Sequence, residues 1–243
     1  MGAIAALLRA GFRHQAAFRF ALVSGILTNA FFGVVRTSVF LAVYRGSEEV
    51  GGLQQADAVT YVWILQATFA VVWAPWMLEL ATRIRSGEWT AELLRPGSVL
   101  VRHLAYDAGR TGAVLALRAP LPPAFAAVVV SLALAGSIAV CVRFLVGSIA
   151  FWTPDFRGVY SLVFGPLFLL SGFVIPVELF PGAMRWVASF SPLGALLRAP
   201  VAVATDRGVL TAVAGQVAWL VVLVVVCHLV LQRATRRMVV FGG

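Results

Sequence analysis

The sequence predicts an all-α membrane protein with six transmembrane helices. Of its 243 residues, 61% are hydrophobic and 12% are charged, and the mean hydropathy is +0.94. Soluble domains are only about half apolar, and the alternating ten-residue strands of a membrane β-barrel are not seen. The net charge of +9 comes from arginines at the ends of apolar runs, so it does not indicate a nucleic-acid partner.

The chain begins with an amphipathic stretch and continues into a first apolar run. Within residues 1–18, the apolar Ile4, Leu8 and Phe12 recur at helical spacing, with basic residues on the opposite side. This pattern predicts an interfacial helix on the inner membrane surface, attracted to anionic lipid. The first span runs from about Phe20 to Tyr44, which exceeds the roughly 20 residues that a bilayer requires.

Arg36 interrupts the first span about two turns from its outer end. It either extends to the outer interface or lines a substrate path. The loop from Arg45 to Asp57 holds three acidic residues and one arginine, so it is expected outside. The second span follows from about Ala58 to Leu80.

The longest polar interval of the chain runs from Glu79 to Asp107. Short loops rich in arginine are retained in the cytoplasm, so this interval sets the orientation of the spans. Within it, Glu88 to Leu94 predicts a short amphipathic helix bounded by Gly87 and Pro96. Such a helix either lies in the lipid headgroups or docks a soluble partner as a helix in a groove.

The third span is incomplete. Only about seven residues lie between Arg110 and Arg118, too few to cross a bilayer. Three clear apolar runs follow, at Leu121 to Trp152, Val159 to Val177 and Thr211 to Leu231. Without a crossing between Asp107 and Leu121, the basic C-terminal tail would lie outside, against the usual charge bias. We therefore predict that roughly one to two dozen residues are absent between Arg118 and Leu121.

The run from Leu121 to Trp152 carries Arg143 two to three turns from its inner end. An arginine at membrane depth is a functional candidate by default. It either pairs with a carboxylate such as Glu79 or lines a substrate path. Cys141 and Cys227 also lie inside apolar runs, and their spacing predicts neither a metal site nor a disulfide framework.

The next run is broken by glycine and proline. Helix-weakening residues interrupt Val159 to Val177, and Pro176 is expected to end it. The segment 176–200 begins too polar to span and is rich in aromatic residues. Irregular backbone at membrane depth must be covered by protein or water, so re-entrant helices on the outer side are predicted, with an ordinary extracellular loop as the alternative. Residues 194–208 are expected to return outside.

Two stretches carry a family resemblance. The sequence IRSGEWTAELLRP, beginning at Ile84, resembles the segment after the second span in permeases of type-2 ATP-binding-cassette (ABC) exporters. The sequence LLSGFVIPVELFPGAMRWVASFSPLGALLRAP, from Leu169 to Pro200, resembles the region around the fifth span in the same family. The two stretches occur in the expected order, and the resemblance covers most of the chain.

The resemblance implies one transmembrane permease domain over residues 1–243, in the bacterial plasma membrane with both termini cytoplasmic. A second permease, identical or homologous, and two ATPase subunits would complete the exporter, with membrane lipid around it. The partner subunits would bind ATP and Mg²⁺, so no cofactor is expected in this chain. An apolar path between two permeases suits a lipidic or amphiphilic substrate.

The resemblance also implies two groups of functional residues. The cytoplasmic docking loop is expected at 83–105, with ATPase-docking residues Arg83, Arg85, Gly87, Glu88, Trp89, Glu92, Leu93 and Arg95. Among these, Trp89 and Leu93 are the expected apolar anchors, inside a charged rim. The substrate path and outer gate are expected at Arg36, Arg143, Gly172, Pro176, Glu178, Phe180 and Trp186.

Catalytic signatures are missing from the sequence. No GxxxxGK[ST] motif occurs, so ATP hydrolysis is expected in partner subunits. A proton-coupled carrier would require acids inside spans and internal repeats, and neither is seen. The ten acidic residues are scattered. An integral-membrane enzyme acting on a lipid-linked substrate is kept as the alternative function.

Overall fold

The computed structural model describes residues 2–17, 19–46, 49–50, 52–72, 76–95, 97–116, 126–153 and 156–241. Within these residues helices dominate and the strands form one small hairpin, which confirms the all-α class. The α-helices are α1 (Gly2–Ala17), α2 (Arg19–Val43), α3 (Gln55–Val72), α4 (Trp76–Arg85), α5 (Glu88–Leu93), α6 (Val99–Ala116), α7 (Ala126–Ser148), α8 (Phe156–Leu170), α9 (Gly182–Phe190), α10 (Pro192–Ala204) and α11 (Val209–Phe241). Short 3₁₀ turns occur at η1 (Tyr44–Gly46), η3 (Ile149–Phe151) and η4 (Val177–Leu179), and the hairpin pairs β1 (Glu49–Val50) with β2 (Leu53–Gln54).

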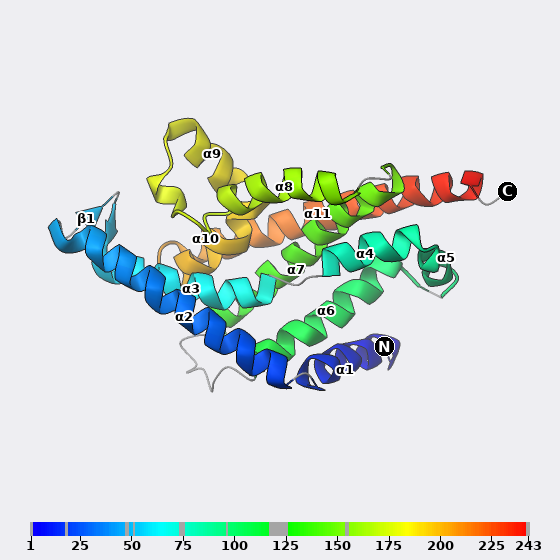
Figure 1. Cartoon of the computed structure of the whole chain (residues 1–243), viewed down its shortest axis with the longest axis horizontal. Helices are drawn as coiled ribbons and strands as arrows, with labels where there is room; N and C mark the ends of the chain where they lie inside the picture. Colours follow the sequence, from blue (N-terminus) through cyan, green and yellow to red (C-terminus); the bar gives the residue numbers. More distant parts are fainter. Residues whose placement is uncertain are drawn as a thin grey trace.

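The molecule is elongated, with different elements at its two ends (Figure 1). One end, called here the α5 end, carries α5, the start of α1 and the end of α11. The opposite end, called the α9 end, carries α9 and the β1–β2 hairpin. The described ends of α1 and α11 therefore lie on the same side of the molecule.

The central helix is α7. It contacts α3, α4, α6, α10 and α11, and most of its side chains are buried. A helix that is apolar around its whole circumference is stable only when other helices or lipid surround it. The core of the molecule therefore forms around α7, and the other helices are positioned by their contacts with it.

Three described helical segments are long and apolar enough to cross a membrane: Val23–Gly46, Ala126–Phe151 and Val209–Arg236. The pair α9 and α10, bent by 87°, would add a fourth if it counts as one broken span. The predicted six spans are thus not confirmed. The second predicted span is divided between α3 and α4, and α8, with 15 residues, extends only about 22 Å of the roughly 30 Å hydrocarbon layer.

The polar interval folds as helices rather than as a loop. The 18-residue α6 begins at Val99, inside the predicted docking loop, and continues to Ala116, within the stretch that we expected to be too short to cross. At about 1.5 Å per residue it extends roughly 27 Å. It carries Arg102 and Arg110, which explains why apolar length alone does not identify it as a span. The predicted gap between Arg118 and Leu121 lies outside the described residues.

The predicted N-terminal helix is present as α1, which packs lengthwise on α6. Glycines make this approach possible, because a Cβ atom at Gly11 would lie 2.0 Å from the Tyr106 carbonyl oxygen and one at Gly109 would lie 2.1 Å from that of Leu8. Small residues allow such backbone contact between membrane helices. The apolar residues of α1 that were expected to face lipid, such as Phe12, remain exposed. The position of α1 at the inner surface stays a prediction.

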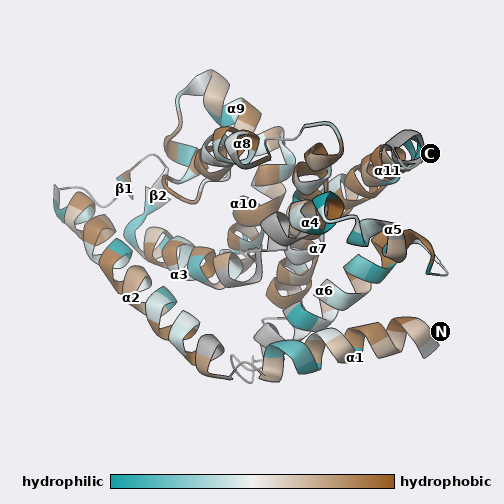
Figure 2. Cartoon of the chain, turned by 45° about the vertical axis from the view of Figure 1, so that its right-hand side comes forward, coloured by the Kyte–Doolittle hydropathy of each residue, from teal (hydrophilic) through white to brown (hydrophobic). Residues whose placement is uncertain are grey.

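Apolar side chains cover much of the outside of the molecule. In Figure 2, hydrophobic residues extend along α2 and α11, whereas polar residues gather where α4, α5 and α6 meet. Only 6% of the apolar segment of α2 and 11% of that of α11 is buried within the chain. Continuous apolar surface of this size requires lipid or another protein to cover it. The chain is therefore a multi-pass membrane protein.

The segment after α8 folds into short helices, and its re-entry into the outer side of the membrane stays a prediction. α8 ends before a turn at Ser171 and Gly172, and η4 and α9 follow. The next helix, α10, packs against α7, α11 and α3, and most of its residues are buried. The expected position of residues 194–208 outside stays a prediction. Leu193, Leu196 and Leu197 recur at helical spacing and are buried in the core.

Candidate functional site

Trp89 fastens α5 to the body of the protein. Its side chain is 0% exposed and stacks on His103 of α6, with ring centroids 5.7 Å apart. The rings of Phe144 and Phe151 lie 6.2 and 6.1 Å away. A six-residue helix is unstable alone and needs such tertiary packing. Trp89, predicted as an anchor for a partner, instead lies in the chain's own core.

Glu92 gathers three arginines on the same side of α5. Its carboxylate lies 3.4 Å from Arg83, 3.3 Å from Arg95 and 3.3 Å from Arg102. Arg102 also donates to the backbone oxygens of Glu92 at 2.5 Å and Gly97 at 2.8 Å. Burial by itself would raise the pKa of Glu92, but the Arg102 hydrogen bond and the charges of Arg95 and Arg83 outweigh it and lower the pKa. The ion cluster therefore ties α4, α5 and α6 together.

Exposed side chains lie on the outward side of α5 and on the two residues that follow it. Glu88 and Arg95 have side chains 63% and 67% exposed, and Leu94 is 83% exposed. Arg85 is also exposed and Gly87 has a φ of +79°, which allows the tight turn between α4 and α5.

Leu93, the second predicted anchor, is partly buried and packs against the core. Our sequence analysis missed Leu94. Once Trp89 is assigned to the inside, helical periodicity places position 94 outside.

Arg36 secures the turn that follows α8. Its guanidinium donates to the carbonyl oxygen of Phe173 at 3.0 Å and lies 4.0 Å from the centre of the Phe173 ring. Tyr61 of α3 donates to the carbonyl oxygen of Gly172 at 2.6 Å. Arg36 therefore holds α2 against this turn and does not line the cavity described below. Its two expected roles, at the outer interface or along a substrate path, stay predictions.

Three other predicted gate residues shape the same turn. Gly172 has a φ of +81°, and a Cβ atom there would lie 2.8 Å from Val177 and 2.9 Å from the Tyr61 hydroxyl. Pro176 and Phe180 are buried. Trp186 of α9 is largely exposed, and its ring packs on that of Phe190 at 5.3 Å.

Arg143 is buried on α7 and does not line the cavity. Its predicted pairing with Glu79 involves a side chain outside the described residues.

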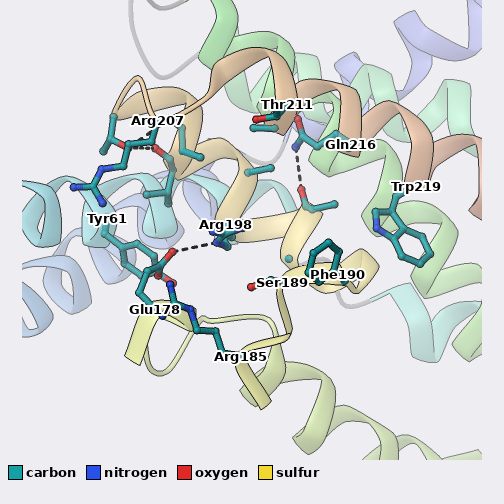
Figure 3. Close-up of a pocket in the computed structure, with 18 of the residues that line it drawn as sticks. Tyr61, Glu178, Arg185, Ser189, Phe190, Arg198, Arg207, Thr211, Gln216 and Trp219 are labelled. Atoms are coloured by element: carbon teal, nitrogen blue, oxygen red, sulfur yellow. Dashed lines mark hydrogen bonds and ion pairs between the residues drawn. The ribbon is translucent and has the colours of Figure 1, made fainter. Parts of the chain in front are cut away.

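A cavity of about 560 Å³ opens at the α9 end, between α3, α9, α10 and α11 (Figure 3). Its charged lining residues are Asp57, Glu178, Arg185, Arg198 and Arg207, and its aromatic lining residues are Tyr61, Phe190 and Trp219. Of the predicted path and gate residues, only Glu178 lines it. A volume of this size accommodates a small-molecule ligand.

Two ion pairs hold the cavity together. Arg198 Nε of α10 donates to Glu178 Oε1 at 3.1 Å, and Arg207, just before α11, pairs with Asp57 of α3. Both pairs join segments that are distant in the sequence. The sequence predicted that Arg198 and Arg207 lie in a segment that returns outside, but a charge pattern alone does not reveal which carboxylate each arginine meets.

Gln216 forms the floor of the cavity. Its side-chain amide donates to the backbone oxygens of Ser131 at 3.0 Å and Ala195 at 2.9 Å, and it accepts from the Ser131 hydroxyl at 2.8 Å. The amide thereby joins α7, α10 and α11, as polar side chains do between membrane helices. The sequence offered one indication of this role, because Gln216 is a polar residue inside a Val-rich apolar run. Among the residues that the structure describes, no three His, Cys, Asp or Glu side chains come together as a metal site would require.

Comparison with known proteins yields one match. A family model described as ABC-2 family transporter protein matches residues 110–242, which is more than half of the chain. The match begins within α6 and includes α10, α11 and most of the cavity lining. Neither the curated proteins nor the solved structures contain a match.

Proposed function

The chain belongs to the ABC-2 family of transporter proteins, and we propose that it is the permease subunit of an ATP-driven exporter. As a member of this family it is a membrane transport component. The proposal adds that its energy comes from two separate ATPase subunits, which bind ATP and Mg²⁺. A second permease, either a copy of this chain or a homologue, would supply the other half of the translocation path.

The exposed surface of α5 is the observation that carries the proposal. A soluble partner can drive a conformational change in the permease only through a contact surface that is held rigidly to the rest of the protein. Trp89 and Glu92 fasten the inner side of α5 to α4, α6 and α7, while Leu94 and Arg95 extend outward beside it. An exposed leucine within a charged rim is the arrangement expected of a contact for a partner's groove.

The arginines around α5 support an orientation. Arg83, Arg85, Arg95 and Arg102 all belong to this segment, and short basic segments are retained in the cytoplasm. We therefore assign the α5 end to the cytoplasm of a bacterial cell and the α9 end to the outside. Because α1 begins and α11 ends at the α5 end (Figure 1), both termini would be cytoplasmic.

The path itself would form between two permeases. The exposed apolar surface of α2 needs a cover, which lipid and the second permease would provide together. ATP-driven association of the two ATPase subunits would then bias the permeases between two packings through α5.

The test is the substitution Leu94→Asp. A carboxylate in place of the exposed leucine should abolish co-purification with the ATPase subunits and ATP-dependent transport, because an apolar contact would have to bury a charge. The fold should persist, since Leu94 contributes little buried surface. Leu210→Asp is the matched control: Leu210 is 82% exposed at the start of α11, away from α5. Unchanged association in Leu94→Asp would reject α5 as the docking element.

A further inference from the structure

Among the described residues that line the cavity at the α9 end, positive charges outnumber negative charges by one. Three arginines and two carboxylates line it, and two of the arginines, Arg198 and Arg207, are paired with Glu178 and Asp57. Arg185 of α9 has no ion-pair partner within the described part of the chain. A guanidinium at a partly enclosed site favours an anion, because the surrounding protein replaces some of its water.

Arg185 is directed at the paired residues. Figure 3 shows its side chain extending from α9 toward the Glu178 side of the cavity, where Arg198 approaches from α10. Arg185 and Arg198 therefore both line the cavity on the Glu178 side in this view, and only Arg198 is paired with Glu178. The planar fork of arginine matches the oxygens of a phosphate or carboxylate and binds either with two parallel hydrogen bonds.

The other side of the cavity is apolar. In Figure 3 the rings of Phe190 and Trp219 lie across from the charged cluster. Phe190 is 66% exposed, so this side is open, and the apolar side chains Val217 and Val221 continue the exposed surface along α11. In a bilayer, lipid chains would cover this part of α11. The cavity is therefore charged at one side and open toward apolar surroundings at the other.

We propose that this cavity binds an amphiphile with a single anionic headgroup, a phosphate or a carboxylate, and an apolar chain. Arg185 binds the headgroup, and Phe190 and Trp219 contact the beginning of the chain, which leaves the cavity along α11. The inference names the substrate class of the permease, and to that extent it rests on the proposed function.

The test measures binding without any ATPase subunit. The purified chain in nanodiscs of neutral lipid is titrated with a fluorescent dansyl-labelled undecanoic acid, and empty nanodiscs are subtracted. Dodecyl phosphate should displace this probe, whereas dodecyltrimethylammonium, with the same chain and the opposite charge, should not. Inorganic phosphate should displace it at least about tenfold less effectively, because it lacks the chain. Equal displacement by the phosphate and ammonium amphiphiles would overturn the proposal.

Two variants assign the roles. Arg185→Gln should weaken dodecyl phosphate binding about tenfold or more, since a hydrogen bond to a charged group is lost. Arg185→Lys should recover part of this loss. Phe190→Ala should weaken dodecyl phosphate several-fold and leave inorganic phosphate unchanged. Both variants are expected to fold, because none of the described residues forms an ion pair with Arg185 and because Phe190 is exposed; size-exclusion chromatography checks this.

Arg45→Gln is the matched control. Arg45 is an exposed arginine of η1 at the same end of the molecule, and it does not line the cavity. The Arg45→Gln substitution changes the net charge by the same amount as Arg185→Gln and should leave amphiphile binding unchanged. If Arg45→Gln and Arg185→Gln weaken binding equally, binding reflects surface charge and the assigned site is wrong.

The two proposals fail separately. The Leu94→Asp variant tests the permease role: it should lose association with the ATPase subunits and should still bind the amphiphile. Absence of charge-selective binding in the wild-type chain rejects the cavity assignment and leaves the permease role standing.

Discussion

Glu92→Gln should loosen the attachment of α5 to α4 and α6 without unfolding the protein. The carboxylate of Glu92 is only 11% exposed and faces three arginines of unequal exposure. Arg95 is 67% exposed, so its pair contributes little, and the pair with Arg83, at 34% exposure, is also weakened by solvent. Arg102, at 17% exposure, supplies most of the effect.

The magnitude follows from that ranking. A hydrogen bond between charged groups contributes about 1.5–3 kcal/mol, and Arg102 keeps its backbone acceptors in the variant. We therefore expect a loss of about 2 kcal/mol in local stability, or roughly a 30-fold larger population of the opened segment. Hydrogen–deuterium exchange of peptides covering residues 83–102 measures this directly. Glu88→Gln is the control, because Glu88 is 63% exposed and lies 3.5 Å from Arg83 alone, so its exchange should match that of the wild type.

The pH dependence provides a second check. Because the folded-state pKa of Glu92 is lowered, its contribution is complete above the unfolded value of about 4.3 and is lost as the pH falls through the folded value. The difference between the wild type and Glu92→Gln should stay constant from pH 5 to 8 and shrink below about pH 4.3. Identical exchange in the two proteins at pH 7 would refute the assignment of Glu92 as the residue that holds α5.

Three further substitutions test the packing. Trp89→Ala should destabilise the protein by about 3–5 kcal/mol because it empties a fully buried site; an unchanged thermal midpoint would mean that this side chain is not in the core. Gly172→Ala should cost about 1–3 kcal/mol, since alanine disfavours a φ of +81° and its Cβ would meet Tyr61 and Val177. Gly25→Ala, at an open helical position, should not lower the midpoint, and equal midpoints for the two alanine variants would contradict the strain argument. Gln216→Leu should lower stability by about 0.5–2 kcal/mol, because the backbone oxygen of Ala195 loses its donor; denaturant titration in detergent measures it, and a gain in stability would be the opposite of our expectation.

Much of the helical architecture could be predicted because hydrophobic length and helix-breaking residues act locally. Gly87 and Gly172 end helices wherever the chain goes afterwards, since both adopt positive φ. The sequence does not show where a helix gains stability from packing. The pattern around Arg198 and Arg207 indicated only that residues 194–208 return outside, whereas the structure shows that α10 forms there and that its leucines are buried against α7 and α11.

For the candidate docking helix, too, the sequence predicted the local structure but not the packing. Periodicity showed that Glu88 to Leu94 is an amphipathic helix, but an apolar face can serve a partner or the chain's own core equally well. The placement of α6 and α7 decided this, because His103 and Phe144 occupy the space against Trp89. Leu94, which is exposed, is therefore the apolar side chain that we propose as the contact for a partner.

The sequence by itself determined that this chain is an all-α membrane protein with a basic, helix-forming segment, because hydrophobic length, charge sign and helix breakers act within one turn or one span. Only the tertiary structure decided which charges meet. Asp57 and Arg207 are 150 residues apart, and Glu178 and Arg198 belong to separate helices. Their pairing depends on how α3, α10 and α11 pack around α7, and that packing leaves Arg185 as the arginine of the cavity without a counter-ion among the described residues.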